Sequence, residues 1–355
     1  MSGENRQKSS PKVELHIHLD GAVRASTVWE LAKKRGVEVP GSNPEELAHI
    51  ISSYERGDLF SFLKAFGIFT PTIVADKDAI RRIAYELCED KANEGVVYLE
   101  MRISPHLLAN AETSWYQDKV KDVLSTREVM ASIVEGLEVG QRDFNIKVRL
   151  IVSTTKQKPE WAAECLQLCK EFSPMTVAMD IGGIENMPLD PAIIKAFQEA
   201  ERCGIHRTIH AGEDGPTSAG NVKEAIELLK AERIGHGYHV LQDESIYQMV
   251  KDLDIHLEVC PTSSVYTGSC DPDYSKHPGV RFTKDKINFS LNTDDPLVFR
   301  NTINDEFEIA KKYFGLTDQA AIQVTLNAAR SAFLPEQEKL ELIQQLRAAY
   351  NLTNE

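Results

Sequence analysis

Short apolar runs rich in β-branched residues alternate with longer amphipathic stretches over most of the chain. Apolar runs of this kind are typical of buried strands, whereas apolar residues that recur three and four positions apart indicate helices with one buried face. We therefore predict eight strands, at residues 13–19, 96–103, 148–153, 176–181, 207–210, 233–236, 256–260 and 288–292. The stretches between them predict helices at 77–94, 126–144, 160–172, 191–203 and 221–231.

Eight strands that alternate with helices predict an α/β protein with a parallel (β/α)8 barrel, the TIM barrel. The alternative with the same alternation is an open, doubly wound sheet. Residues 44–68 predict a helical insertion after the first strand, and residues 318–332 and 335–350 predict extra peripheral helices. Because the chain has neither an internal repeat nor a linker rich in Pro, Gly or Ser, we expect one domain over residues 1–355, with disorder in residues 1–10.

The composition agrees with a globular domain, since 42% of the 355 residues are hydrophobic and 26% are charged. The formal net charge of −14 repels phosphate, so we expect neither nucleic acid nor an anionic membrane as a partner. Six scattered cysteines without a CxxC pair disfavour both a disulfide framework and a thiolate metal site. The polar N-terminus lacks the apolar core of a signal peptide, and no apolar run is long enough to span a membrane, which favours a cytoplasmic protein.

Reactive side chains follow the ends of the predicted strands, where the active sites of (β/α)8 barrels lie. His16 and His18 occupy alternate positions of the first strand, so both point to the same side of the sheet. His210 ends the fifth strand, and His236 ends the sixth between two glycines. The other candidates at strand ends are Glu213, Asp294 and Asp295. Their positions predict that these side chains meet at the mouth of the barrel.

Three histidines and a carboxylate from separate strand ends form a nitrogen and oxygen ligand set that suits zinc. A catalytic zinc site keeps one position open for water and makes that water more acidic. Glu213, His236 and Asp295 are then available for proton transfer and for holding a substrate. The alternatives are structural histidines in the first strand and a helix N-cap at Asp294 and Asp295. Among the other histidines, His206 shares a face with His210 but lies nearer the start of its strand, and His239 is not on the face of His236. We identify no convergent partner for His49, His106, His256 and His277.

Five long strings of residues resemble the adenosine deaminase family, and they are spread over residues 11–350. The strings are PKVELHIHLDGA at 11–22, EGVVYLEMRISPHLLAN at 94–110, GIHRTIHAGEDG at 204–215, RIGHGYH at 233–239 and SLNTDDPLVF at 290–299. The resemblance implies a (β/α)8 barrel that binds one zinc ion per chain. It also implies an enzyme of purine metabolism that hydrolyses adenosine and 2′-deoxyadenosine to inosine and 2′-deoxyinosine, with release of ammonia.

The resemblance also implies roles for individual residues. The implied metal ligands are His16, His18, His210 and Asp294. Glu213 is expected to protonate purine N1, and His236 to orient and deprotonate the water together with Asp294. An acid beside N1 is needed because addition at C6 breaks the aromaticity of the ring and would otherwise leave negative charge on it.

The implied substrate contacts cover the base, the ribose and a lid. The expected residues are His18, Asp20 at the ribose 5′-hydroxyl, the Gly183 amide at N3, Asp295 at N7, and the hydrophobic lid residues Leu59, Phe62, Leu63 and Phe66. Purine N7 can accept a hydrogen bond but cannot donate one, so Asp295 is expected to be protonated when the substrate is bound.

The chain departs from the family pattern at the rim of the expected pocket. Ile184 follows Gly183 where the family usually has an acidic residue, with Glu185 next. The loop 214–221 is slightly longer than usual, and Thr262 stands where a tryptophan is common. We expect these differences to change affinity and the tolerance of purine substituents rather than the reaction.

Other functions fit parts of the pattern. A relative that acts on AMP or an N6-substituted AMP is disfavoured because the carboxylate of Asp20 would repel a phosphate, and free adenine would leave Asp20 without a partner. An inactive binding protein with this fold would be expected to lose a ligand or the acid, and every matched position is intact. Another amidohydrolase, such as a metal-dependent esterase, would not be expected to share Glu213 or the paired aspartates. The expected chemistry requires one chain and no oligomer.

Overall fold

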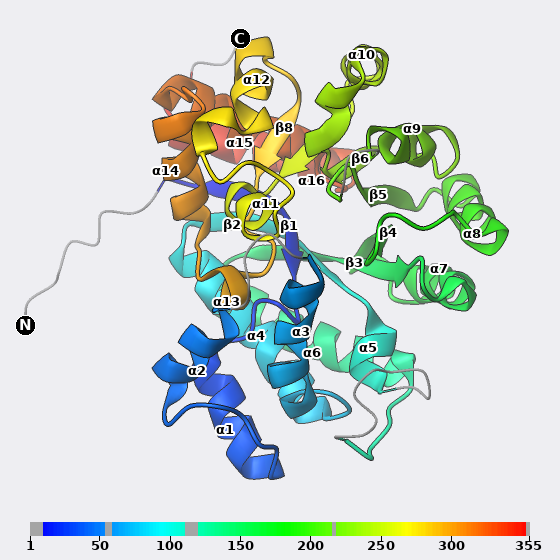
Figure 1. Ribbon diagram of the computed structural model, residues 1–355, viewed down its shortest axis with the longest axis vertical. Coiled ribbons are helices and arrows are strands. Elements are labelled where there is room, and N and C mark those ends of the chain that lie inside the picture. Colours follow the sequence, from blue (N-terminus) through cyan, green and yellow to red (C-terminus); the bar gives the residue numbers. More distant parts are fainter. Residues whose placement is uncertain (1–9, 54–58, 111–119, 215–217, 353–355) are drawn as a thin grey trace, which may run out of the picture.

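The computed structural model describes residues 10–53, 59–110, 120–214 and 218–352. The strands are β1 Lys12–His18, β2 Val96–Ile103, β3 Lys147–Thr155, β4 Thr176–Gly182, β5 His206–Ala211, β6 Arg233–His236, β7 His256–Val259 and β8 Phe289–Leu291. They form one sheet of eight parallel strands in sequence order (Figure 1). A bridge between Ile17 and Asp294 joins the end of β8 to β1, so the sheet closes almost completely. This arrangement confirms the predicted (β/α)8 barrel and excludes an open sheet.

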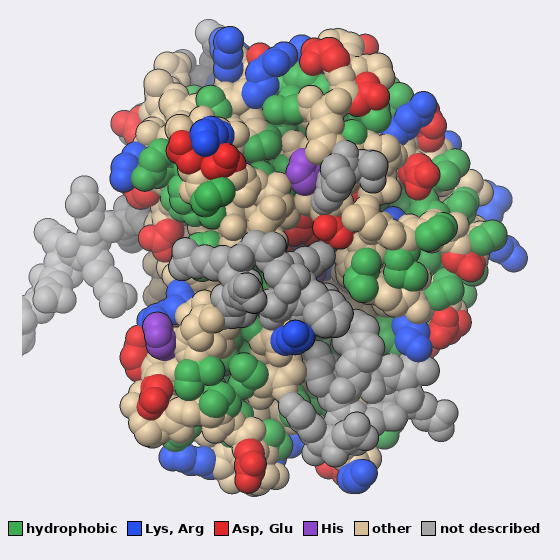
Figure 2. Space-filling view, in the orientation of Figure 1, with side chains coloured by type: hydrophobic (Ala, Val, Ile, Leu, Met, Phe, Trp, Pro, Cys, Tyr) green, Lys and Arg blue, Asp and Glu red, His purple; other side chains and the backbone are tan. Residues whose placement is uncertain are grey.

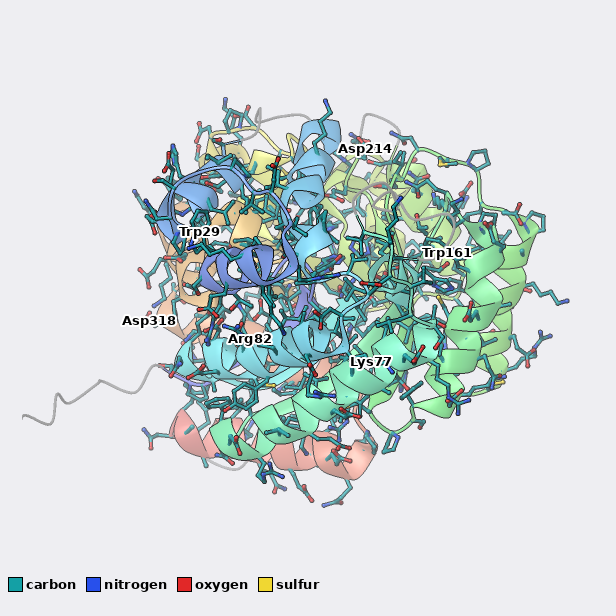
Figure 3. The ribbon with its side chains drawn as sticks, turned by 90° about the horizontal axis from the view of Figure 1, so that it is seen from below. Trp29, Lys77, Arg82, Trp161, Asp214 and Asp318 are labelled. Carbon is teal, nitrogen blue, oxygen red and sulfur yellow. The ribbon has the colours of Figure 1, made fainter. Side chains whose placement is uncertain are left out.

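Helices surround the barrel as its outer layer (Figure 1). The longer ones between strands are α4 Lys77–Asn93, α6 Thr126–Phe144, α7 Ala162–Glu171, α8 Pro191–Arg202, α9 Ala219–Glu227, α10 Glu244–Asp252 and α12 Pro278–Asp285, and α14 Ile303–Tyr313 follows β8. The five predicted helices are all present, with ends that differ by a few residues at most. Figure 3 shows α4 and α6 side by side, and Lys77 pairs with Glu128 between them at 2.7 Å. Gly136 permits this close packing, because a Cβ there would lie 2.2 Å from Arg81 O.

The segment between β1 and α4 contains three helices, which are α1 Ala25–Arg35, α2 Pro44–Ile51 and α3 Leu59–Phe69. The predicted insertion at 44–68 covers α2 and α3, whereas α1 was not predicted. α2 begins after Asn43, whose side chain accepts a hydrogen bond from the Glu46 amide at 2.9 Å. Three short helices, α5 Pro105–Ala109, α11 Pro261–Tyr266 and α13 Pro296–Phe299, follow β2, β7 and β8.

The last two helices are the predicted peripheral ones, α15 Asp318–Ser331 and α16 Glu336–Ala349. Their buried residues Leu326, Leu342 and Leu346 pack with Val13 and Leu15 of β1. Because these β1 residues lie near the start of the strand, the tail helices leave its carboxyl end available for a site.

The surface of the molecule carries charged side chains of both signs. They are interspersed on the face that Figure 2 shows, and Lys and Arg do not gather into one patch there. No helix within the described ranges is both long and apolar enough to cross a membrane.

Candidate active site

A pocket at the carboxyl ends of the strands brings the predicted residues together. It is lined by His18, Asp20, Phe62, Phe66, Gly183, His210, Glu213, His236, Asp294 and Asp295, among others. His16 is fully buried beneath the surface of the pocket, with its ring 5.5 Å from that of His18. Side chains that are far apart in the sequence therefore share one site.

The ligand atoms of four side chains converge in this pocket. His18 Nε2 lies 3.2 Å from His210 Nε2 and 3.3 Å from Asp294 Oδ1. His16 Nε2 also lies 3.3 Å from Asp294 Oδ1, yet it forms no hydrogen bond with any described residue. Burying a ring nitrogen without a hydrogen bond is costly. A metal ion bound between these atoms would use all four, so the residues fit a metal.

Carboxylates hold the other nitrogens of two histidine rings. His16 Nδ1 lies 2.7 Å from Glu258 Oε2, and His210 Nδ1 lies 3.0 Å from Asp180 Oδ1. Each contact favours the ring proton on Nδ1 and leaves Nε2 as a ligand atom toward the pocket, as in metal-binding histidines generally.

Buried arginines keep these two carboxylates ionised. Glu258 accepts hydrogen bonds from Arg102 at 2.6 Å and from Arg233 at 2.8 Å, and Arg102 lies 3.3 Å from Asp180. Burial alone raises the pKa of Glu258, but the two guanidinium groups hold it well below its ordinary value. The charged interior of the barrel therefore orients the histidines.

Two residues of the site have left-handed backbone conformations although they are not glycines. The φ angles are +71° at His236 and +67° at Asp294, and such a conformation costs on the order of 1 kcal/mol per residue. Asp294 is held by hydrogen bonds with β1, in which its O accepts from His18 N at 2.9 Å and its N donates to His16 O at 3.2 Å. Ser263 Oγ also donates to Asp294 Oδ2 at 2.7 Å. The barrel therefore fixes the carboxylate in one orientation.

Two acids in the pocket favour the protonated form. Burial raises the pKa of Glu213 well above its ordinary value, and the negative charges of Asp294 and Glu185 raise it further. Burial likewise raises the pKa of Asp295, together with the charges of Asp294, Asp20 and Glu213. A metal ion in the site would offset part of both shifts with its positive charge. Both carboxyl groups are suited to donate a proton or a hydrogen bond.

Asp295 reaches the pocket because Gly21 has no side chain. A Cβ at Gly21 would lie 1.7 Å from Asp295 Oδ1. That oxygen is buried and has no hydrogen-bond partner among the described residues. A ligand with a hydrogen-bonding atom beside this oxygen would supply the missing partner.

His236 is held by a tyrosine rather than by a carboxylate. Its Nδ1 lies 3.0 Å from the hydroxyl of Tyr238, and that hydroxyl donates to Cys260 O at 3.0 Å. The tyrosine oxygen then accepts the Nδ1 proton, which leaves Nε2 able to take up a proton. His236 Nε2 lies 3.5 Å from Glu213 Oε2. Burial, reinforced by His16, lowers the pKa of His236 well below its ordinary value, so the ring is neutral.

The described part of the predicted lid lines the pocket through Phe62 and Phe66 of α3. Phe62 also stacks on Phe299 of α13, with ring centroids 5.3 Å apart. The side chains of Leu59 and Leu63 lie outside the described residues, as do residues 1–9 of the predicted disordered terminus and positions 215–217 of the longer loop.

The pocket also includes residues that the sequence analysis did not predict. They are Ser104, Leu107, Ser153, Thr154, Thr155, Gln157, Lys158, Trp161, Gly182 and Thr267. Several of them follow β2 and β3, so their position after predicted strands was the one feature of the sequence that could have indicated a place in the pocket. Their residue types gave no signal, because serine, threonine and glutamine are common in any loop.

The other histidines with described contacts have ordinary partners outside the cluster of candidate metal ligands, which are His16, His18, His210 and Asp294. These contacts are His106 with Glu164, His206 with Glu232, His239 with Ser218, His256 with Asn288, and His277 with Ser264. They agree with the expectation that these histidines do not converge on the site.

Glu306 of α14 anchors the short helix that carries Ser263. Its Oε2 accepts from the Thr262 amide at 2.9 Å, and its Oε1 accepts from Asn301 Nδ2 at 2.6 Å. Burial raises the pKa of Glu306 to about 7, above the ordinary value of 4.5. A carboxyl group whose pKa is raised on folding stabilises the fold at low pH, and this contribution is lost as the pH rises through the folded-state pKa.

The free energy of unfolding of Glu306→Gln, relative to that of the unchanged protein, is therefore expected to increase between about pH 5.5 and about pH 8.5. Over that range, ionisation of Glu306 should lower the free energy of unfolding of the unchanged protein by about 2 kcal/mol, whereas glutamine does not titrate. Urea unfolding at both pH values measures the difference. Glu308→Gln is the matched control, because that side chain lies on the same helix and is 75% exposed. An identical pH dependence for Glu306→Gln and the unchanged protein would contradict the assignment.

A (β/α)8 barrel with histidines and an aspartate gathered at the carboxyl ends of its strands defines a metal-dependent amidohydrolase. The family model described as "Adenosine deaminase" matches residues 11–349. The chain therefore belongs to the adenosine deaminase family, as the resemblance indicated, and is a hydrolytic deaminase.

Similar proteins support this assignment over nearly the whole chain. The chain is 48% identical over 346 residues to adenosine deaminase of Gallus gallus, with 96% of each chain covered. It is 45% identical over 351 residues to adenosine deaminase of Bos taurus, with 97% of this chain and 95% of that one covered.

Solved structures share the fold. The arabidopsis N6-mAMP deaminase has a TM-score of 0.81 and 28% identity, covering 98% of this chain and 99% of that chain. The adenine deaminase from Arthrobacter aurescens has a TM-score of 0.84, covering 97% of this chain and 100% of that chain. Because the latter is only 23% identical, it bears on the fold alone.

Proposed function

We propose that this protein deaminates adenosine and 2′-deoxyadenosine, with one zinc ion held by His16, His18, His210 and Asp294. The observation that carries the proposal is Glu213, whose side chain is 13% exposed and whose Oε2 lies 3.5 Å from His236 Nε2, in the pocket where the candidate metal ligands meet. Hydrolysis at C6 of a purine needs such an acid beside N1.

The chemistry of the ligand atoms favours zinc. Three imidazole nitrogens and one carboxylate oxygen form a mixed set that suits zinc better than Ca²⁺ or Mg²⁺, which prefer oxygen ligands. When bound, zinc would supply an activated water molecule as the nucleophile.

The residues of the chain would divide the proton transfers between them. Neutral His236 would accept a proton at Nε2, and Glu213 would donate one to N1 as the ring loses its aromaticity. The proton taken up by His236 can then be passed to the amino group, which departs as ammonia, and the hydroxyl proton left on C6 can return to Glu213 as the C6 carbonyl forms. Two neighbouring groups with pKa values shifted in opposite directions are the arrangement that a paired base and acid need.

The purine would be oriented by two groups that line the pocket. Asp295 would donate a hydrogen bond to N7, and the Gly183 amide would donate one to N3. Gly183 has a φ of +88°, and a Cβ there would lie 2.6 Å from both Thr155 Oγ1 and Gln157 Oε1. A side chain at this position would therefore disturb the pocket wall.

The lid would cover the substrate with apolar side chains. The aromatic rings of Phe62 and Phe66 line the pocket, and we propose Leu59 and Leu63 as further members of the lid. His18, which also lines the pocket, would complete the substrate contacts.

Asp20 favours a nucleoside over a nucleotide. Asp20 lines the pocket and is 8% exposed. Burial raises its pKa to about 6, so the group is still ionised at neutral pH. A hydroxyl group can donate to this carboxylate, whereas a phosphate ester would be repelled by it. We therefore propose that Asp20 receives the ribose 5′-hydroxyl.

Adenosine and 2′-deoxyadenosine are expected to be converted to their inosines, which ultraviolet absorbance follows directly. The value of kcat/KM should be at least about 100-fold lower for AMP and N6-methyl-AMP, because of the charge on Asp20. A strong chelator should remove activity slowly, and added zinc should restore it.

Free adenine, assayed in parallel, separates ribose recognition from base recognition. Faster turnover of a phosphorylated substrate would contradict the role of Asp20. Absence of turnover with every substrate, while zinc analysis finds one ion per chain, would contradict the proposed reaction.

Three further expectations from the sequence stay proposals. They are a cytoplasmic location, one domain over residues 1–355, and a site that is complete within one chain. The last is supported by the pocket, in which the candidate metal ligands, the acid Glu213 and the base His236 of a single chain already meet.

A further inference from the structure

Three consecutive peptide N–H groups converge on the side chain of Glu185. Its Oε1 accepts from Gly212 N at 2.6 Å, and its Oε2 accepts from Glu213 N and Asp214 N, each at 2.8 Å. Asn221 Nδ2 donates to Oε1 at 2.8 Å as a fourth partner. Glu185 is 5% exposed. Hydrogen bonds from several amides to one buried carboxylate are strong, and they fix the backbone that donates them.

The conformation of this turn depends on Gly212. Its φ is +74°, and a Cβ there would lie 2.8 Å from Val222 Cγ2. The left-handed residue turns the three N–H groups to one side. The opposite edge of the turn is held by the segment that follows β6, since Gly212 O accepts from His239 N at 3.0 Å.

The backbone of Glu185 is also anchored. Lys156 Nζ donates to Glu185 O at 2.7 Å and to Met187 O at 3.1 Å, and Lys156 is itself buried. The carboxylate therefore sits on a fixed base and holds the turn that carries Glu213.

We propose that Glu185 is a positioning residue that holds the Glu213 turn, so that the Glu213 carboxyl group stays directed at purine N1. The proposal rests on the proposed role of Glu213. Glu185 is not part of the pocket lining, so it acts through Glu213 and not on the substrate. Its negative charge also contributes to the raised pKa of Glu213.

The test is Glu185→Gln, which keeps the size of the side chain but turns an NH2 group toward N–H donors. Because small displacements of a reacting group cost up to about 100-fold in rate, we expect kcat for adenosine to fall by about 30-fold, with KM changed by less than about threefold. Glu185→Asp keeps the charge but shortens the reach, and its kcat should be intermediate. Asn186→Ala is the matched control, because Asn186 is exposed and contacts the same turn at Asp214 O. Its kcat should be unchanged.

Inhibition by 1-deazaadenosine separates positioning from general damage to the pocket. This compound has the shape of adenosine but lacks N1, so it makes no use of the proton of Glu213. Its inhibition constant should be the same for Glu185→Gln and the unchanged protein. An unchanged kcat in Glu185→Gln, or a loss of 1-deazaadenosine binding in proportion to the loss of kcat, would overturn the proposal. Full activity in Glu213→Gln would instead overturn the proposed function on which it rests.

Discussion

Glu213→Gln is expected to lower kcat for adenosine by about 1000-fold. Glutamine has nearly the same shape and can still donate a hydrogen bond to N1, but it has no proton to transfer as C6 is attacked. Binding of the substrate should be nearly unchanged, since the hydrogen bond remains. Steady-state kinetics with adenosine check both parts, because kcat reports the proton transfer and KM reports binding when the chemical step is slow. A kcat within about tenfold of the unchanged protein would exclude Glu213 as the acid.

The pH dependence gives a second test of the same group. Glu213 acts in its protonated form, so activity should fall as the pH rises through its pKa. Burial places that pKa well above the ordinary carboxyl value of 4.5, and this keeps the group protonated at a pH where an exposed glutamate is ionised. The alkaline decrease in kcat/KM should be absent from Glu213→Gln. If the variant shows the same alkaline decrease, that limb belongs to another group.

The strands were the most predictable part of the fold. β2 Val96–Ile103 and β6 Arg233–His236 have the predicted ends, because Gly95 precedes the first run and Glu232 and Gly237 bound the second. β3 Lys147–Thr155 extends beyond the prediction at 148–153, since its polar last residues still pair with β4. The short helices α5, α11 and α13 were not predicted. Each has too few residues for a helical period to be visible.

The candidate site was predictable as far as residue type and strand position allow. His16, His18 and His210 are reactive residues at predicted strand ends, so a barrel brings them together. Asp180 and Glu258 were not predicted, because a single sequence does not reveal which carboxylate of one strand faces which histidine of another. Glu185 shows the same limit, since three of its four partners are backbone amides, which leave no trace in residue types. The roles of all these side chains in catalysis stay predictions.

The contrast between Asp295→Asn and Asp295→Ala tests how the purine is oriented. Because N7 accepts hydrogen bonds and cannot donate, the group opposite it must be a donor. Asparagine keeps a donor at that place, whereas alanine removes it and leaves N7 buried without a partner. We expect kcat/KM for adenosine to fall by about fivefold in Asp295→Asn and by about 100-fold in Asp295→Ala, as the loss of one buried hydrogen bond predicts.

A substrate that lacks N7 separates this hydrogen bond from other effects at Asp295. 7-Deazaadenosine carries a C–H group in place of N7 and gains nothing from a donor. The ratio between the two variants should therefore shrink from about 20-fold with adenosine to about one with 7-deazaadenosine. Asp295 also lies beside the proposed ligand Asp294, so zinc content is measured in each variant and must match that of the unchanged protein. Equal losses in both variants with adenosine, at full zinc content, would mean that Asp295 acts through its charge and not as a donor to N7.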